Sequence, residues 1–195
     1  MITNIDQLDF TKQYTYADYL TWRFDERVEL IRGWISRMSP APLVSHQRIL
    51  MRLSLPIGNY LANKKCELFV APFDVRLTNK RKSVPNKSIT SVVQPDLSII
   101  CDIEKLDEKG CIGAPDWIIE ILSPGNTRKE MKEKFSLYEE NGVREYWIVD
   151  PVHLMVQVFD LKEDKFAWRS NYVKEDLIPV GIFEDFFIDS DAVFN

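Results

Sequence analysis

Cysteine and histidine are scarce in this sequence, and their scarcity limits the metal sites and cross-links that the chain can form. Among 195 residues there are three cysteines, Cys66, Cys101 and Cys111, with no CxxC spacing and an odd total. Neither a disulfide framework nor a zinc ribbon is expected from this pattern, and we predict reduced, largely buried thiols. With only His46 and His153, a histidine-rich metal centre is excluded. A bound metal ion would need mainly carboxylate ligands, which favours Mg²⁺ or Mn²⁺ over Zn²⁺.

Long apolar runs are also absent. No segment approaches the roughly 18 consecutive apolar residues of a membrane-spanning helix, and the N-terminal MITNIDQLDF has neither a basic leader nor an apolar signal core. We therefore expect a cytoplasmic protein without membrane contact. With 195 residues, 45% of them hydrophobic, the chain is long enough for one substantial core and short for two. A single domain spanning residues 1–195 is expected.

Positive charge is not in excess, since the net charge is -5. This balance counts against a protein that coats nucleic acid non-specifically, because affinity for phosphates comes chiefly from Lys and Arg. One local exception is the segment 79–88, NKRKSVPNKS, which contains four basic residues and no acid: Lys80, Arg81, Lys82 and Lys87. The segment is typical of an exposed loop between strands, and it is either a solvated hairpin tip or a loop that contacts phosphates.

Helical and strand-like patterns alternate along the chain, which predicts an α/β fold. Thr15 and Asp18 have the spacing of a capping box and predict a short helix to about Trp22, followed by strands at VELI and WISRM that turn at Gly33. Apolar residues recur at helical spacing over about 45–63. Within that helix, Pro56 predicts a kink or a break.

The remainder of the chain is dominated by predicted strands, which are rich in β-branched or aromatic residues and bounded by turn-forming residues. They are CELFVAPFDVRLT, VVQPDLSIIC, PDWIIEIL, REYWIVDP, HLMVQVF, FAWRSNYV and the region near GIFEDFFI. A helix is predicted over about 128–141, with a second capping box at Thr127 and Glu130 and a terminating Gly142. The fold expected is a mixed central β-sheet flanked by helices. Aromatic residues of 145–149 are interpreted as strand core rather than as a base-stacking platform.

Two acidic residues stand in apolar surroundings. Asp96 follows Pro95 at the start of the strand LSII, and Glu120 lies inside the run WIIEIL. Burying an ionised carboxylate without a partner costs several kcal/mol, so Glu120 needs a cation, a hydrogen-bond network or an open sheet edge. A shared metal ion would satisfy both acids. Taken separately, each acid has a simpler explanation. An aspartate after proline is usually a turn residue, and a glutamate in a strand often lies at an exposed edge of the sheet.

The helix that follows Glu120 offers a positive partner. At about 100° per residue, Met131, Phe135 and Tyr138 lie on one face, and Lys134 is about 60° from its centre. Its ammonium is therefore placed to reach the sheet, although a lysine in this position usually extends to water. Asp96, Glu120 and Lys134 together indicate a catalytic site.

Motifs along most of the chain resemble the Uma-type endonuclease family, which belongs to the PD-(D/E)xK, restriction-endonuclease-like superfamily. The matching segments are Gln94-Pro95-Asp96, Glu120-Ile121-Leu122-Ser123-Pro124, Glu130-x-x-x-Lys134-x-x-x-Tyr138, Gly142-Val143-x-Glu145-Tyr146-Trp147-x-Val149-Asp150-Pro151, Val28-Glu29-Leu30-Ile31-x-Gly33, Met38-Ser39-Pro40 and Ser45-His46-Gln47. They run from about residue 14 to residue 151. Many short matches in the same order make chance an unsatisfactory explanation.

This resemblance implies a restriction-endonuclease-like fold whose Asp96 and Glu120 bind Mg²⁺, with Lys134 beside them and Glu29 assisting. In the superfamily pattern a lysine stands two residues after the glutamate, where this chain has Leu122. The Uma-type pattern implies that Lys134 substitutes from the helix. His46 matches a family position without an assigned role.

The resulting hypothesis is a metal-dependent nuclease that hydrolyses phosphodiester bonds of DNA, with catalytic Asp96, Glu120, Lys134 and Glu29. The metal ligands would be Asp96, Glu120 and the backbone carbonyl of Ile121, and Glu29 would complete the shell or hold a second ion. Homodimerisation is expected because cutting a duplex needs two active sites or two visits. The alternative is an inactive module that binds nucleic acid or oligomerises. A small-phosphoester hydrolase is less favoured, since the sequence has no Gly-rich phosphate loop or aspartyl-nucleophile motif.

Overall fold

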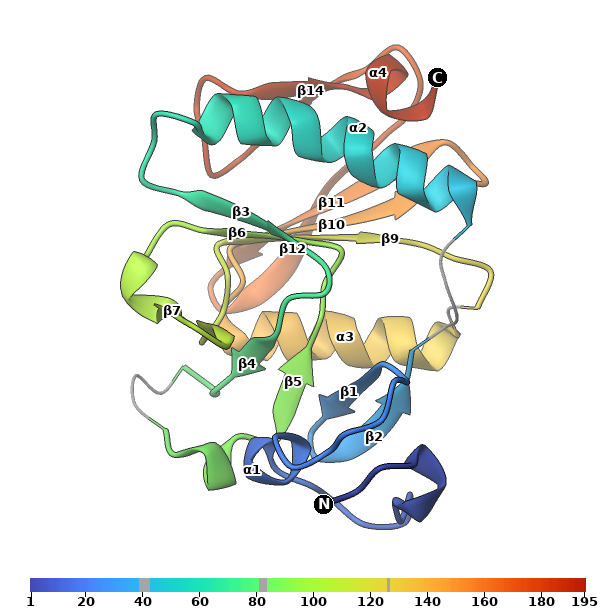
Figure 1. Cartoon of the computed structure of the whole chain (residues 1–195). Helices are drawn as coiled ribbons and strands as arrows, with labels where there is room; N and C mark the ends of the chain where they lie inside the picture. Colours follow the sequence, from blue (N-terminus) through green and yellow to red (C-terminus); the bar gives the residue numbers. More distant parts are fainter. Residues whose placement is uncertain (39–42, 81–83, 126) are drawn as a thin grey trace.

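The computed structural model describes residues 1–38, 43–80, 84–125 and 127–195. These residues form two six-stranded sheets, a two-stranded ribbon and a few helices (Figure 1). The helices are η1 (Ile5–Gln7), α1 (Tyr16–Tyr19), α2 (Val44–Leu61), η2 (Asn86–Ser88), η3 (Ile103–Lys105), α3 (Arg128–Asn141) and α4 (Ser190–Phe194). The fold therefore mixes α and β elements, as the sequence predicts.

A central sheet with the strand order β12-β11-β10-β9-β6-β3 organises the molecule. Its strands are β3 (Glu67–Val70), β6 (Leu97–Ile100), β9 (Trp117–Ile121), β10 (Glu145–Asp150), β11 (Met155–Lys162) and β12 (Lys165–Tyr172). The neighbours β9 and β10 are parallel, and the other pairs are antiparallel. Parallel strands need a crossover connection, which α3 supplies. The predicted mixed sheet is thus confirmed.

The two long helices cover opposite faces of this sheet (Figure 1). Alternate residues of β9 divide between them: Trp117 and Ile119 pack in a cluster with α2, whereas Ile118 packs in a cluster with α3. Side chains on a strand alternate between faces, so Glu120 is directed to the α3 side. The ribbon formed by β13 (Leu177–Pro179) and β14 (Phe187–Asp189) packs on the α2 side together with α4.

A second sheet lies beyond α3, with the order β2-β1-β5-β4-β8-β7 (Figure 1). Its strands are β1 (Val28–Ile31), β2 (Trp34–Arg37), β4 (Val75–Leu77), β5 (Ser91–Val93), β7 (Leu106–Asp107) and β8 (Gly110–Ile112). One face shares a core with α3 and the central sheet, and the other is covered by the N-terminal segment. The site described below lies where these two sheets approach α3.

The chain crosses between the two sheets at two short corners, and there two strand predictions were wrong. CELFVAPFDVRLT is not one strand but two, β3 and β4, separated at Ala71-Pro72 and placed in different sheets. VVQPDLSIIC likewise divides into β5 and β6 at Gln94-Pro95-Asp96. In each case the proline interrupts the strand, because it lacks the N–H that a ladder requires.

The helix and turn predictions hold with two corrections. Thr15 and Asp18 form the predicted capping box, but α1 ends at Tyr19 rather than near Trp22. Gly33 and Gly142 both have positive φ and turn the chain as expected. A kink or a break was predicted at Pro56. The helix does not break there, because α2 continues through Pro56 to Leu61. Packing of α2 on the central sheet outweighs the hydrogen bond that proline removes.

The prediction that all three cysteines are reduced was also wrong. Cys66 and Cys101 form a disulfide, whereas Cys111 is a buried free thiol. The cause is strand register: Glu67 of β3 pairs with Ile100 of β6, which brings the two flanking cysteines opposite one another. A sequence separation of 35 residues gave no local signal for this pairing.

Three smaller expectations can be compared with the structure. Trp147 and Tyr146 are buried, which agrees with strand core rather than a stacking platform. In the basic segment, Lys80 is paired with Asp164, but Arg81 and Lys82 lie outside the described residues, so both interpretations of the loop stay open. Within the described ranges, none of the helices combines the length and apolar character needed to cross a membrane.

The packing of α2 gives a stability prediction with an internal control. Leu53 is 0% exposed and faces the central sheet, whereas Leu55 on the same helix is 59% exposed. Leu53→Ala should lower the free energy of unfolding by about 2–5 kcal/mol through lost burial and a residual cavity. Leu55→Ala should change it by less than about 0.5 kcal/mol. Urea denaturation measures both, and equal losses would contradict this packing.

Candidate functional site

Glu120 is the acidic side chain at the centre of the candidate site. It lies on β9 between buried neighbours, facing α3, and its side chain is 14% exposed. Its Oε1 atom accepts hydrogen bonds from Lys134 Nζ at 3.0 Å and from the Tyr138 hydroxyl at 2.6 Å. The partner that the sequence required for a carboxylate in this strand is therefore supplied by the following helix.

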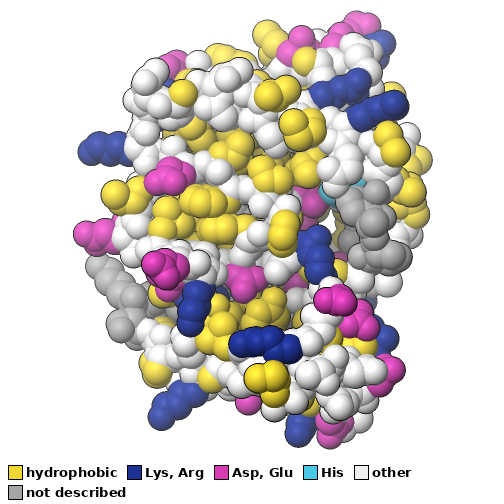
Figure 2. All heavy atoms as spheres, viewed as in Figure 1, with side chains coloured by type: hydrophobic (Ala, Val, Ile, Leu, Met, Phe, Trp, Pro, Cys, Tyr) yellow, Lys and Arg dark blue, Asp and Glu magenta, His cyan; other side chains and the backbone are white. Residues whose placement is uncertain are grey.

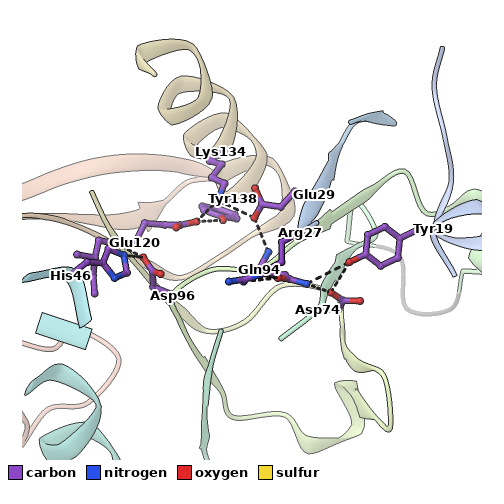
Figure 3. A network of polar contacts seen from close by, with 11 residues as sticks. Tyr19, Arg27, Glu29, His46, Asp74, Gln94, Asp96, Glu120, Lys134 and Tyr138 are labelled. Atoms are coloured by element: carbon purple, nitrogen blue, oxygen red, sulfur yellow. Dashed lines mark hydrogen bonds and ion pairs between the residues drawn. The ribbon is translucent and has the colours of Figure 1, made fainter. Parts of the chain in front are cut away.

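Lys134 joins the two sheets through its ammonium group. The group lies 3.0 Å from Glu120 Oε1 and 3.0 Å from Glu29 Oε1, with side-chain exposures of 8% for the lysine and 1% for Glu29. Glu29 belongs to β1 of the second sheet, and its Oε1 also accepts the backbone N–H of Gln94 (Figure 3). The predicted direction of Lys134, toward the sheet rather than to water, is what the structure has.

The position of Lys134 follows from local helix signals. Thr127 caps α3 by accepting the N–H of Glu130, and Gly142 ends the helix in a left-handed conformation. Tyr138 stands four residues after Lys134, so both side chains lie on neighbouring turns of one face. Its contact with Glu120 was not predicted, because Tyr138 was assigned to the apolar face of the helix and to the family motif without a role at the site. The spacing of four from Lys134 was the available signal.

Asp96 reaches the same place from the corner between β5 and β6. Its Oδ2 atom accepts the backbone N–H of Ile121 at 2.8 Å and lies 3.2 Å from Nε2 of His46 on α2. Within the described residues, Asp96 Oδ1 and Glu120 Oε2 make no hydrogen bond to the protein. His46, to which the sequence gave no role, is thus a buried partner of Asp96, and its Nδ1 has no partner in that same part of the chain.

Burial and charge oppose one another at this site. Burial raises the pKa of Glu120 to about 7, with the charges of Asp96 and Glu29 adding to the effect and Lys134 acting against it. For Lys134, burial works to lower the pKa, but Glu120 and Glu29 more than offset it, and the net pKa is raised. The amine is therefore a charged donor near neutral pH. The site contains three carboxyl groups, those of Asp96, Glu29 and Glu120, and a single ammonium group beside them.

A pocket of about 320 Å³ opens onto these residues. Its lining includes Asp96, Glu120, Ile121, Lys134, His46 and Arg27. Figure 2 shows acidic side chains and a histidine inside a hollow on one face of the molecule. Glu29 is not among the lining residues and contacts Lys134 from behind. Of the four predicted catalytic residues, three line one pocket and the fourth is buried against it.

A metal ion at this site would have few ligands from protein side chains. In the described ranges, no group of three or more His, Cys, Asp or Glu side chains is arranged to hold a metal ion. The predicted ligands are two carboxylates and the carbonyl of Ile121, and Asp96 and Glu120 each keep one oxygen without a protein donor in the part described. Mg²⁺ is commonly bound by one or two carboxylates and keeps several waters.

Leu122 occupies the position at which the superfamily pattern has lysine. Its side chain packs against the apolar cluster that contains α3, and its N–H donates to Val149 O of β10. A lysine here would enter that apolar cluster. The ammonium that contacts Glu120 comes from Lys134 instead, as the resemblance implies.

Comparison with known proteins gives related sequences and a related structure. The family model Uma2, described as "Putative restriction endonuclease", matches residues 16–189. The uncharacterized protein slr1290 of Synechocystis sp. is 25% identical over 162 residues, which are 82% of this chain and 80% of that protein. The crystal structure of a putative nuclease belonging to DUF820 from Anabaena variabilis has a TM-score of 0.71 at 20% identity, covering 93% of this chain and 97% of the other. This likeness places the fold among the restriction-endonuclease-like α/β folds.

The ion pairs of Lys134 give a second stability prediction. Lys134→Met should lower the free energy of unfolding at pH 7 by about 3–5 kcal/mol, because two buried carboxylates lose their counter-charge. Lys129→Met is the matched control, since Lys129 lies on the same helix with its side chain 83% exposed. Chemical denaturation of both variants measures the difference. A loss no larger for Lys134→Met than for Lys129→Met would contradict the arrangement.

The raised pKa of Glu120 predicts how stability depends on pH. The folded protein holds this proton up to pH about 7, whereas the ordinary value is 4.5, so between these values folding is accompanied by proton uptake. The free energy of unfolding of metal-free protein should therefore fall as pH rises from 4.5 to 7. Glu120→Gln should flatten this fall. Denaturation in a chelator across that range tests it, and parallel pH profiles of the two proteins would reject it.

Proposed function

The chain belongs to the Uma2 family, and from this membership and the geometry of the site we propose that it is a metal-dependent nuclease that hydrolyses phosphodiester bonds of DNA. The observation that carries the proposal is the convergence of Asp96, Glu120 and the ammonium of Lys134 on one pocket. Two acids can hold a metal ion, and a cation beside them can stabilise the charge that develops on a phosphoryl oxygen. The family description supports the reaction class.

Asp96, Glu120 and the carbonyl of Ile121 would hold Mg²⁺, with Mn²⁺ as a substitute. When bound, such an ion polarises a phosphodiester and lowers the pKa of a coordinated water. Asp96 is kept in place by the Ile121 N–H and by His46, both of which contact Oδ2, so its Oδ1 atom would be available to hold the ion. Glu120 is fixed through Oε1 by Lys134 and Tyr138.

Lys134 acts as a charged donor rather than as a base, because its pKa is raised by Glu120 and Glu29 despite burial. In this role it orients the attacking water or stabilises the charge that develops on the phosphoryl oxygens. Glu29 supports Lys134 as a buried counter-charge. That Glu29 completes the metal shell or holds a second ion stays a prediction, as does homodimerisation.

A second candidate is a catalytically inactive member that binds nucleic acid or oligomerises. Two observations favour it: Leu122 stands where the superfamily lysine would be, and the ammonium of Lys134 already has two carboxylate partners. Calorimetric titration with Mg²⁺ or Mn²⁺ separates the candidates. A nuclease should bind the ion in a manner that Asp96→Asn removes, whereas an inactive module has no such requirement.

Conservative substitutions test the proposed function. Asp96→Asn and Glu120→Gln should each lower Mg²⁺-dependent DNA cleavage by at least about 100-fold, because each removes a ligand charge while keeping side-chain volume. Glu108→Gln, an exposed charge change in the turn between β7 and β8, should leave the rate unchanged. Cleavage of a labelled duplex is the measurement, with circular dichroism to verify folding. Equal activity in wild type and both site variants would refute the proposal.

A further inference from the structure

Arg27 is a cation of the pocket that the hydrolytic site does not use. It precedes β1, is exposed and lines the same pocket as Asp96 and Glu120. Its guanidinium donates twice to the side-chain carbonyl of Gln94, from Nε at 3.1 Å and from Nη2 at 2.7 Å. Within the described ranges it forms no ion pair with a carboxylate. Its charge is therefore available to a ligand.

A network of half-buried side chains, Gln94, Asp74 and Tyr19, holds Arg27 in this position (Figure 3). Arginine can only donate, so the carbonyl of the Gln94 amide must face it and the amide nitrogen must face the other way. That nitrogen donates to Asp74 Oδ1 at 2.9 Å, and Asp74 lies 3.4 Å from the hydroxyl of Tyr19. The amide stands between the guanidinium and the carboxylate of Asp74, so Arg27 acts on the pKa of Asp74 through its charge and forms no direct ion pair with it.

The charges around the pocket explain why such a cation matters. Asp96, Glu120 and Glu130 line it, and the ammonium of Lys134 is shared between two carboxylates. A nucleic-acid strand that enters this pocket therefore meets more acidic than basic side chains. An arginine that is fixed at the pocket without a carboxylate partner in the described residues offers several donors to a phosphate, in the planar geometry that phosphate oxygens accept.

We propose that Arg27 binds a backbone phosphate next to the scissile phosphodiester, and that Gln94, anchored by Asp74, is its positioning residue. This inference rests on the proposed function and specifies the substrate class further. The substrate is a polynucleotide, which has a neighbouring phosphate for Arg27 to bind. A small phosphodiester lacks that phosphate and gains nothing from the arginine.

Binding measurements test Arg27 independently of cleavage. In the Glu120→Gln background with Mg²⁺ present, Arg27→Gln should weaken binding of a short DNA duplex roughly 10- to 100-fold. The slope of log affinity against log salt concentration should decrease in magnitude by about 1, which corresponds to the loss of one phosphate contact. Arg37→Gln is the matched control: Arg37 is exposed on β2, pairs opposite Val28 and does not line the pocket. It should alter neither quantity.

Kinetics with the catalytic residues intact separate the neighbouring phosphate from the scissile one. Arg27→Gln should lower kcat/KM for DNA and leave kcat/KM for bis(4-nitrophenyl) phosphate unchanged. Gln94→Leu should raise KM for DNA, and the double variant Arg27→Gln/Gln94→Leu should show no further loss, because Gln94 acts through Arg27. An additive loss in the double variant would overturn the positioning role of Gln94.

The remaining outcomes distinguish failure of this inference from failure of the proposed function. If the wild type binds and cuts DNA and Arg27→Gln behaves like Arg37→Gln, the role of Arg27 is wrong and the nuclease function stands. If Arg27→Gln slows both substrates equally, Arg27 acts at the scissile phosphate, and the inference is overturned. If the wild type neither binds nor cuts DNA or RNA, the proposed function fails and this inference fails with it.

Discussion

The buried ammonium of Lys134 is the interaction on which the rest of the site depends. It lies 3.0 Å from a carboxylate of β1 in the second sheet and 3.0 Å from a carboxylate of β9 in the central sheet. Without it, the carboxylates of Glu29 and Glu120 would lose the ion pair that each makes with Lys134. One side chain of α3 therefore links the two sheets at the pocket, beside the apolar core that both sheets share with this helix.

This arrangement balances stability against reactivity. Glu120 and Glu29 share one ammonium, and burial together with the charges of Asp96 and Glu29 raises the pKa of Glu120. A core selected for stability alone would place apolar side chains here. The unbalanced negative charge is instead the property that a divalent cation would relieve, so the cost to folding and the proposed chemistry have the same physical origin.

Local sequence signals were sufficient to predict α3, the helix that carries Lys134. They were insufficient to predict the two corners at which the chain passes from one sheet to the other. Caps at Thr127 and Gly142 fixed the bounds of α3, and periodicity then gave the direction of Lys134. The division of two apparent strands between two sheets depends on tertiary packing, which no local pattern records. The pairing of Cys66 with Cys101 depends likewise on the register of β3 and β6. Helix periodicity predicted that Lys134 reaches the sheet that carries Glu120, whereas the participation of Glu29 came from the family resemblance.

The corner formed by Gln94, Pro95 and Asp96 has a consequence for how this pocket can vary. Gln94 anchors Arg27, and Asp96, two positions later, meets Ile121. Successive Cα atoms are about 3.8 Å apart, and proline restricts the backbone between them. The separation of the two anchors is thus a matter of covalent geometry. Loops around the pocket can therefore differ in length and composition and change the shape of its entrance. The distance along the chain between the residue that holds Arg27 and the residue that contacts Ile121 stays the same.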